Sequence, residues 1–417
     1  MICNFVSSFK RMDYEVYQLA NGIRLIHTRV PSLVAHLGVI MGTGSRDELD
    51  HEHGMAHFIE HMVFKGTRKR KAYHILSRLE DVGGEINAYT TKEETCVYAS
   101  FMKEDYARAM ELLQDILFHS AFSEKEIGRE KEVIIDEINS YFDSPGELIF
   151  DDFEEQLYKG QSIGRNILGS PKSLAGFKQA DLLRFVSNNY NSDEMVICSV
   201  GNISFPRLKK GIEKYFGQVP FKSRNHQRPG IRPYDPSSIT LQKDTYQAHC
   251  IIGNLAFGLN DERRIGLHLL NNIIGGPGLN TRLNLSLREK NGYSYHTESH
   301  YSPYSDTGVL SVYFSSDKSK LKQSNKVVIR EFSKLREKKL GTLQLSKAKR
   351  QLMGQIAISA ENHETLMLSM AKSYLVYNKF DDLKEIGKKI DRITADEILE
   401  IANEVLDDAK LSSLIFI

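Results

Sequence analysis

The chain carries an internal repeat, and this feature restricts it to a fold made of two similar units. The segment Ala180–Leu183 (ADLL) recurs as Ala395–Ile398 (ADEI), 215 residues later. Each copy begins a short predicted helix, and an apolar strand follows each helix, at Met195–Val200 in the first half and at Leu411–Ile417 in the second. Units of this length are large enough to bury a core of their own. We therefore predict two homologous domains.

A segment rich in proline and basic residues separates the two copies. Between residues 217 and 238 the sequence loses its apolar periodicity and gathers four prolines and four basic residues, a composition typical of a connecting loop. We place an N-terminal domain at 1–222, a linker at 223–238 and a C-terminal domain at 239–417. In both halves strands pair before a helical block instead of alternating singly with helices. This order favours an α+β fold, with a mainly antiparallel sheet and helices packed on one face in each domain.

The first half contains a motif that can bind a metal. Residues 57–61 read His-Phe-Ile-Glu-His, so on a helix His57 and His61 lie one turn apart on the same face. Two imidazoles at this spacing can hold one Zn²⁺, with Zn–N distances of about 2.0–2.1 Å. Glu60 projects to nearly the same side, where its carboxylate can take a proton from a zinc-bound water. The alternative is a helix whose histidines cap or hydrogen-bond within a core.

The second half lacks this motif. When Gly66 is matched to Gly275, an offset of 209, the positions of the two histidines and the glutamate correspond to Gly266, Leu269 and Leu270. None of these three side chains binds a metal, so we expect no metal site in the second half. The lone His268 nearby is expected to be a core or surface residue.

Catalytic zinc usually takes three protein ligands and a water, and residues 124–140 offer candidates for the third. Ser123 is a predicted N-cap, with Glu126 completing a capping box. The stripe of the predicted helix runs through Ile127, Glu130, Ile134, Glu137 and Tyr141. Carboxylates on a buried stripe are costly unless they are paired or bound to a metal, which makes Glu130 and Glu137 candidate functional residues. The alternative is that this stripe lies at a domain edge where the glutamates are hydrated.

With these motifs the chain resembles the pitrilysin/insulinase family of zinc peptidases. This inverzincin family, named for the motif H-x-x-E-H, includes the mitochondrial processing peptidases, and the chain is similar to its short bacterial-type members. In the family a glutamate follows the second histidine by about 76 positions, which is Glu137 here, and another stands seven residues earlier, at Glu130. The resemblance covers nearly the whole chain. Its other matching segments are 44–48, 54–56, 62–67 and 83–90, together with Thr95 and Tyr98.

The resemblance implies a zinc site and a general base. His57, His61 and Glu137 would bind one Zn²⁺ per chain, and Glu60 would act on the zinc-bound water. Glu130 would orient one of the two histidines by hydrogen bonding. The resemblance also implies that each domain is an α/β roll and that the two domains enclose a chamber.

The segment Ile86–Phe101 is predicted to form a β-hairpin, with its turn at residues 92–94. By resemblance, Asn87 and Ala88 belong to an edge strand beside the metal, and an extended peptide substrate adds to that edge as another strand. Backbone hydrogen bonds would then bind many peptide sequences, and pockets would add preference. The alternative is an ordinary hairpin with no role in binding.

Arg288 and Tyr295 match an arginine and a tyrosine that the family carries seven positions apart. By resemblance, the pair reaches the zinc site from the other domain. Tyr295 would donate a hydrogen bond to the oxyanion and Arg288 would hold the substrate backbone. The chain departs from the family at Tyr293, where a small or aliphatic residue is usual, although the spacing favours Tyr295 as the functional tyrosine. The alternative is a surface arginine with two core tyrosines.

Charge and composition exclude some other classes of partner. The 55 basic and 54 acidic residues nearly cancel, so nothing favours binding to nucleic acid or to a membrane.

The N-terminal segment has neither a secretory signal pattern nor an Arg-rich amphipathic pattern. The cysteines are scattered without metal or disulfide spacing, at Cys3, Cys96, Cys198 and Cys250. Three of them lie in apolar or strand contexts and are expected to be buried thiols, so we expect a cytoplasmic protein.

The sequence therefore predicts a zinc-dependent metalloendopeptidase that hydrolyses short or unfolded peptides. Because one chain carries both the zinc set and the Arg288–Tyr295 pair, we expect it to work as a homodimer without a specialised partner. Two alternatives remain open. One is a non-catalytic peptide-binding or assembly subunit, and the other is one half of a heteromeric processing peptidase.

Overall fold

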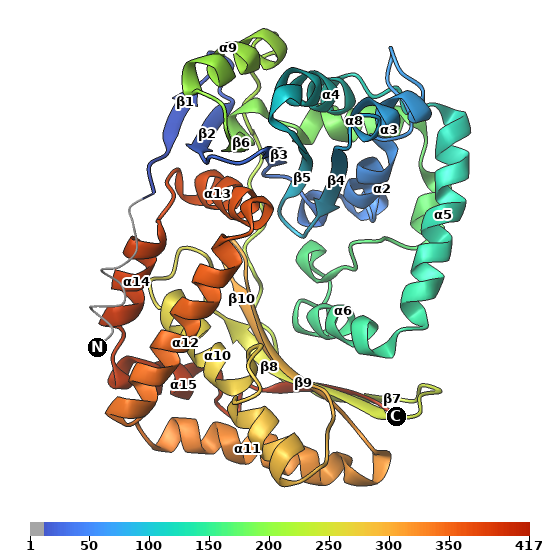
Figure 1. Cartoon of the computed structure of the whole chain (residues 1–417). Helices are drawn as coiled ribbons and strands as arrows, with labels where there is room; N and C mark the ends of the chain where they lie inside the picture. The colour runs from blue at the N-terminus through green and yellow to red at the C-terminus, as the bar shows by residue number, and fades with distance from the viewer. Residues whose placement is uncertain (1–11) are drawn as a thin grey trace.

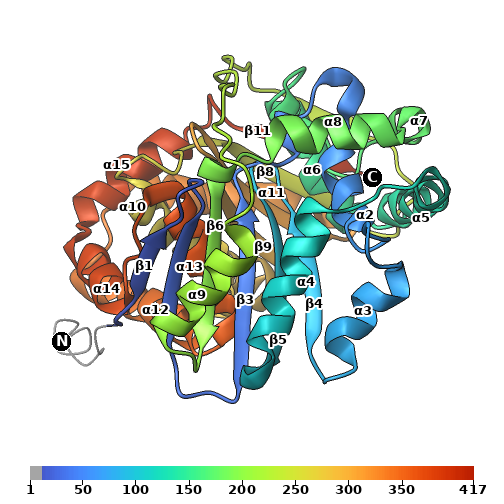
Figure 2. The same ribbon diagram turned by 90° about the horizontal axis from the view of Figure 1, so that it is seen from above.

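The computed structural model describes residues 12–417, which form two mixed α/β halves with one sheet each (Figure 1). Residues 1–11, which include Cys3 and the start of the predicted N-terminal domain, lie outside the described part. The first sheet has the strand order β1-β2-β6-β3-β5-β4, visible across Figure 2. Its strands are β1 (Glu15–Gln18), β2 (Arg24–Arg29), β3 (Val34–Met41), β4 (Glu85–Thr90), β5 (Thr95–Met102) and β6 (Met195–Gly201).

The second sheet repeats this arrangement. Its strand order is β7-β11-β8-β10-β9, and its strands are β7 (Ser238–Leu241), β8 (Ala248–Ala256), β9 (Thr297–Pro303), β10 (Gly308–Ser316) and β11 (Ser412–Phe416). In each sheet one strand, β6 in the first and β11 in the second, is parallel to one neighbour and antiparallel to the other. All other strand pairs are antiparallel. The predicted α+β fold of two related units is confirmed, and β1 is an addition to the first unit.

Each half covers one face of its sheet with its own helices. In the first half these are α2 (Met55–Met62), α3 (Ala72–Glu80), α4 (Tyr106–Phe118), α5 (Glu124–Phe142), α7 (Pro171–Gly176), α8 (Gln179–Asn189) and α9 (Phe205–Phe216). In the second half they are α10 (Arg264–Gly275), α11 (Leu321–Glu337), α12 (Thr342–Ala360), α14 (Leu383–Arg392) and α15 (Ala395–Val405).

The opposite face of each sheet is covered by a helix from the other half. Helix α13 (His363–Tyr377) of the second half packs its Met367 and Met370 on Ile40 and Val196 of the first sheet. Helix α6 (Pro145–Leu157) of the first half packs Phe153 on the second sheet. The central strands β6 and β10 are buried along their whole length, so their apolar side chains need cover on both faces. The sequence predicted helices on one face of each sheet only. The other face is covered because the two halves exchange helices, α13 packing on the first sheet and α6 on the second.

The local signals of α5 are partly confirmed. Its N-cap is Ser123, whose hydroxyl accepts a hydrogen bond from the Glu126 backbone N–H. The predicted capping box is wrong, because the Glu126 carboxylate pairs with Arg129 at 3.1 Å instead of bonding back to the cap. The cysteines of the described range, Cys96, Cys198 and Cys250, are buried free thiols as expected. No helix within residues 12–417 has the length and apolar character needed to cross a membrane.

Candidate metal centre

Helix α2 presents its polar side chains on one face and its apolar side chains on the other. Phe58, Ile59 and Met62 are buried in the first core, and their spacing turns His57, Glu60 and His61 toward α5 and the edge strand β4. His57 is 8% exposed, whereas Glu60 and His61 are half-buried. The helical spacing predicted for the two histidines is therefore observed.

The structure brings His57, His61 and Glu137 together. Glu137 Oε1 lies 3.8 Å from His57 Nε2, and Glu137 Oε2 lies 3.5 Å from His61 Nε2. The ligand atoms of all three residues lie within 4.8 Å of one another. Two ligands that share a tetrahedral zinc at about 2.1 Å are about 3.4 Å apart, so two imidazole nitrogens and a carboxylate at these distances fit Zn²⁺. Across residues 12–417 no other group of histidine, cysteine and acidic side chains meets this distance criterion.

Glu130 lies behind His61. Its carboxylate accepts a hydrogen bond from His61 Nδ1 at 2.8 Å and from Lys65 Nζ at 2.8 Å, and it is 3% exposed. Burial opposes its charged form, but these two donors outweigh burial and lower the pKa of Glu130. Burial likewise opposes a charged His61, yet Glu130 and Glu137 raise the pKa of that imidazole. Glu130 therefore orients His61 and leaves its Nε2 directed toward Glu137. Sequence reasoning assigned no role to Lys65.

His57 is held differently. Its Nδ1 is buried and has no hydrogen-bond partner. Burial and the neighbouring His61 lower the pKa of His57 to about 4, so its ring is neutral at pH 7. A neutral imidazole is the form that binds a metal.

Glu60 lies between the metal-binding group and the end of β4. Burial raises the pKa of Glu60, and the Thr90 side chain opposes this rise by favouring the charged carboxylate. A raised pKa makes a carboxylate a stronger base, which suits proton abstraction near neutral pH. Sequence reasoning gave no role to Thr90, because the contact depends on α2 packing against β4.

The predicted hairpin is confirmed, and β4 is the edge strand of the first sheet (Figure 2). Asn87 pairs with Tyr98 and Ala88 with Val97, and the turn occupies residues 91–94. Asn87 is exposed and Ala88 is half-buried. Within the described chain no strand pairs with the other side of β4. That side is open to an added peptide strand.

Arg288 and Tyr295 lie in the second half. Arg288 is in a π-helical turn (Asn284–Lys290), and its guanidinium carbon lies 5.1 Å from the Tyr295 ring centre. Tyr295 is 79% exposed. No hydrogen bond or ion pair within residues 12–417 joins either side chain to the metal-binding group. Tyr293, in contrast, packs against the second core.

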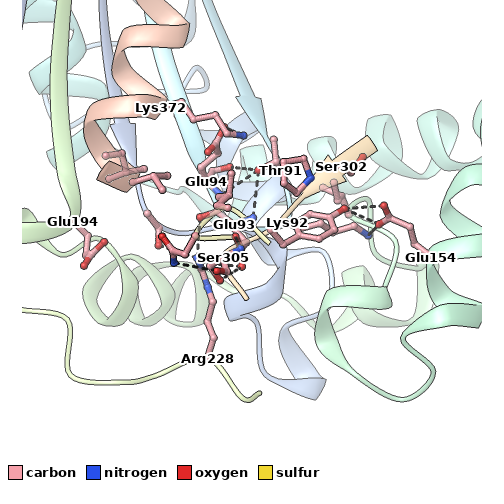
Figure 3. A pocket seen from close by; sticks show the side chains of 18 of the residues that line it. Thr91, Lys92, Glu93, Glu94, Glu154, Glu194, Arg228, Ser302, Ser305 and Lys372 are labelled. Carbon is pink, nitrogen blue, oxygen red and sulfur yellow. Dashed lines mark hydrogen bonds and ion pairs between the residues drawn. The ribbon is translucent and has the colours of Figure 1, made fainter. Parts of the chain in front are cut away.

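A cavity of about 600 Å³ lies between the two halves (Figure 3). Its walls come from the β4–β5 turn, α6, α13, the linker and the loop that joins β9 to β10. Nine of its 21 lining residues are charged. The Glu93 carboxylate accepts hydrogen bonds from Arg46 of its own half and from the Ser305 N–H of the other. None of the metal-binding residues lines this cavity.

Comparison with known proteins now identifies the family. The sequence model described as Insulinase (Peptidase family M16) matches residues 25–171, and the one described as Peptidase M16 inactive domain matches residues 176–352. An uncharacterised zinc protease of Bacillus subtilis is 32% identical over 402 residues, covering 96% of this chain and 97% of the relative. The chain belongs to peptidase family M16.

Other M16 relatives extend this result. An uncharacterised zinc protease of Rickettsia felis is 32% identical over 405 residues, with 97% of each chain covered. A protease from Helicobacter pylori shares the fold with a TM-score of 0.92 at 19% identity, covering 98% of this chain and all of that one. The M16 inactive domain from Pseudomonas fluorescens has a TM-score of 0.90 at 18% identity, and the match covers 97% of this chain and 98% of that one. The predicted family membership is confirmed, and zinc protease relatives support a protease at the family level.

Proposed function

We propose that this M16 protein is a zinc-dependent metalloendopeptidase that cleaves short or unfolded peptides. The observation that carries the proposal is the grouping of His57, His61 and Glu137 within 4.8 Å, with the Glu60 carboxylate on the same helix face. A bound Zn²⁺ would polarise the scissile carbonyl and lower the pKa of a water in its open position to about 7.

The side chains of the site divide the remaining work. Glu60 takes a proton from the attacking water and gives it to the leaving amine. Glu130 holds the ring of His61 through Nδ1, and the Thr90 side chain at the end of β4 favours the charged form of Glu60. Asn87 and Ala88 on the open edge bind the substrate backbone as an added strand. Such binding needs an extended peptide, so folded proteins are excluded.

The proposal extends to a homodimer in which each copy completes the metal centre of the other. Within residues 12–417 no hydrogen bond or ion pair joins Arg288 or Tyr295 to the metal-binding group, and Tyr295 is mostly exposed to solvent. A second copy related by a twofold axis can bring the pair to the metal centre, and the same contact then forms twice. Tyr295 would stabilise the oxyanion and Arg288 would hold the substrate. We also propose a cytoplasmic location, supported by three buried free cysteines.

A non-catalytic peptide-binding subunit, or one half of a heteromeric processing peptidase, is the rival function. The first test is zinc stoichiometry on the purified chain, together with cleavage of a quenched unstructured peptide with and without chelator. About one zinc per chain, with cleavage abolished by the chelator, is expected. In Glu60→Gln we expect zinc to stay bound while turnover falls by at least about 10²–10⁴-fold. Zinc without cleavage by the wild-type chain would favour the rivals.

Mixing two inactive variants tests the homodimer. Glu60→Gln keeps the Arg288–Tyr295 pair intact, and Tyr295→Phe keeps the metal centre intact. If the pair acts on the other copy, each mixed dimer has one complete site out of two. Random pairing makes about half of the dimers mixed, so activity returns to about a quarter of the wild-type value. If the pair acts within its own chain, mixing restores nothing. Sedimentation showing a fully active monomer would also contradict the homodimer.

A further inference from the structure

The two histidines of the metal centre differ in how they are held. His61 is oriented by a hydrogen bond between its Nδ1 and Glu130 at 2.8 Å. The Nδ1 of His57 is buried, but it makes no hydrogen bond to any residue of the described range 12–417. Metal-binding histidines usually donate this second N–H to a carboxylate, a carbonyl or a water, which fixes the ring. The placement of His57 must therefore come from the backbone of α2 to a greater degree than that of His61.

The backbone before His57 is fixed by a buried carboxylate. Glu48 is 4% exposed. Its Oε2 accepts a hydrogen bond from the Gly54 N–H at 2.9 Å, and its Oε1 accepts one from the Ala56 N–H at 2.9 Å. The N-cap residue of α2 is Gly54, which has no side chain to cap the helix. Glu48 therefore supplies the cap from eight residues upstream of Ala56, the direct neighbour of His57.

A second contact, between Gly54 and Gly169, packs against the start of α2. Gly54 has φ +92°, and its Cα faces Gly169, which has φ +81°. A Cβ added to Gly54 would lie 2.7 Å from the Gly169 Cα and 2.8 Å from the Leu168 oxygen. The start of α2 is thus held between this backbone contact and the Glu48 carboxylate.

We propose that Glu48 is a positioning residue that sets the place of His57 in the metal centre through the first turn of α2. The inference rests on the proposed zinc site, but it is tested on metal binding and not on cleavage. Replacing the carboxylate by an amide puts an NH₂ group against a backbone N–H, so one of the two hydrogen bonds is lost and the turn shifts. Glu137 lies on α5, outside the shifted turn.

The experiment compares Glu48→Gln with Glu52→Gln. Glu52 is a matched control because it is also buried, at 3% exposure, and its carboxylate also caps a backbone N–H, that of Leu49 at 3.1 Å. It does not bond to α2. Zinc affinity is measured by competition with a chromophoric chelator, and the ligand geometry by the visible absorption of the Co²⁺-substituted protein. Far-UV circular dichroism of the zinc-free proteins shows whether each variant folds.

We expect zinc affinity to fall about 10- to 100-fold in Glu48→Gln, with an altered Co²⁺ spectrum. Glu52→Gln should bind zinc within about threefold of wild type and give the wild-type spectrum. Wild-type affinity and spectrum in Glu48→Gln would overturn the inference, and so would equal losses in both variants. If Glu48→Gln does not fold, Glu48→Asp decides: its shorter carboxylate retains one bond, so reduced affinity supports the inference and unchanged affinity refutes it. A wild-type chain that binds no zinc would instead defeat the proposed function.

Discussion

At the scale of single residues, Glu130 and Glu137 stand two turns apart on α5 and yet meet different atoms. Glu137 faces Nε2 of both histidines, whereas Glu130 bonds to His61 Nδ1 and to Lys65. We predict that Glu137→Gln lowers zinc affinity by more than about 100-fold, since a ligand is weakened. Glu130→Gln should lower zinc affinity by about 10- to 100-fold, since only the hydrogen bond that orients His61 is lost. Chelator competition measures both, and zinc loss in Glu130→Gln alone would reverse the assignment.

His268 gives the second half a pH-dependent stability. It packs on the Tyr301 ring with 4.6 Å between ring centres, and burial, followed by the nearby Arg264 charge, lowers its pKa to about 4. The unfolded chain, with the ordinary value near 6.5, binds more protons between these two pH values. Folding is therefore favoured above pH 6.5 and progressively weakened as pH falls toward 4.

We predict that this histidine accounts for about 2 kcal/mol of the stability lost between pH 7 and pH 5. Urea unfolding of zinc-free wild type and His268→Asn at both pH values measures the difference, and the metal-free form avoids competition at the zinc ligands. The variant should lose less stability on acidification. An identical loss in the two proteins would show that His268 is protonated in the folded state.

The candidate ligand residues were predictable from their spacing and, for Glu137, from the resemblance to the family. Two histidines four residues apart on a helix share one face. A carboxylate on an apolar stripe must be paired or bound to a metal, because a buried charge is otherwise costly. Glu48, Thr90 and Lys65 carry no such signal. Each is an ordinary polar residue in the sequence, and its partner in the site is identified only once α2, α5 and β4 have packed together.

At the scale of elements, the open edge of β4 makes the proposed strand addition testable. In an added strand only alternate residues direct their N–H groups toward the edge. We predict that N-methylation of a peptide substrate lowers kcat/KM about tenfold at alternate positions, the cost of one lost backbone hydrogen bond. Methylation at the positions between them should have little effect and serves as the control. A loss without this period of two would contradict strand addition.

The elements with strong local patterns were predicted well. The helical stripe through Ile127 and Ile134 located α5, the spacing of the two histidines indicated α2, and strand-like residues on both sides of residues 92–94 located the hairpin. The π-helical turn at Asn284–Lys290 was not predicted, since its sequence is compatible with an ordinary helix. The Glu126 capping box failed for a similar reason, because Arg129 competes for the same carboxylate one turn away.

At the scale of the whole molecule, each half packs one helix, α6 or α13, on the sheet of the other half. Figure 1 shows α5 running from the first half toward α6, which lies against the second sheet, while α13 lies against the first. The equivalent turns of the two repeats also meet, since Arg46 bonds to Asp306 at 2.7 Å and Glu93 to Ser305. Sequence reasoning predicted neither α6 nor α13, and nothing in their residues tells which sheet each helix covers.

This exchange predicts that the two halves unfold together. Phe153 on α6 and Met367 on α13 are fully buried against the sheet of the other half. Phe153→Ala should destabilise the chain by about 3–5 kcal/mol and Met367→Ala by about 2–5 kcal/mol. Because each helix joins both halves, calorimetry should show one transition that moves to lower temperature in both variants.

Leu183→Ala on α8 is the control, since Leu183 is 45% exposed and its removal should change stability by no more than about 0.5 kcal/mol. Two separate transitions, with only one displaced by each core variant, would mean that the halves are independent units and that the exchanged helices contribute little. A single shared transition would mean that a change in either half alters the stability of the metal centre. Zinc binding, which stabilises the folded state, should then raise the melting temperature of the second half as much as that of the first.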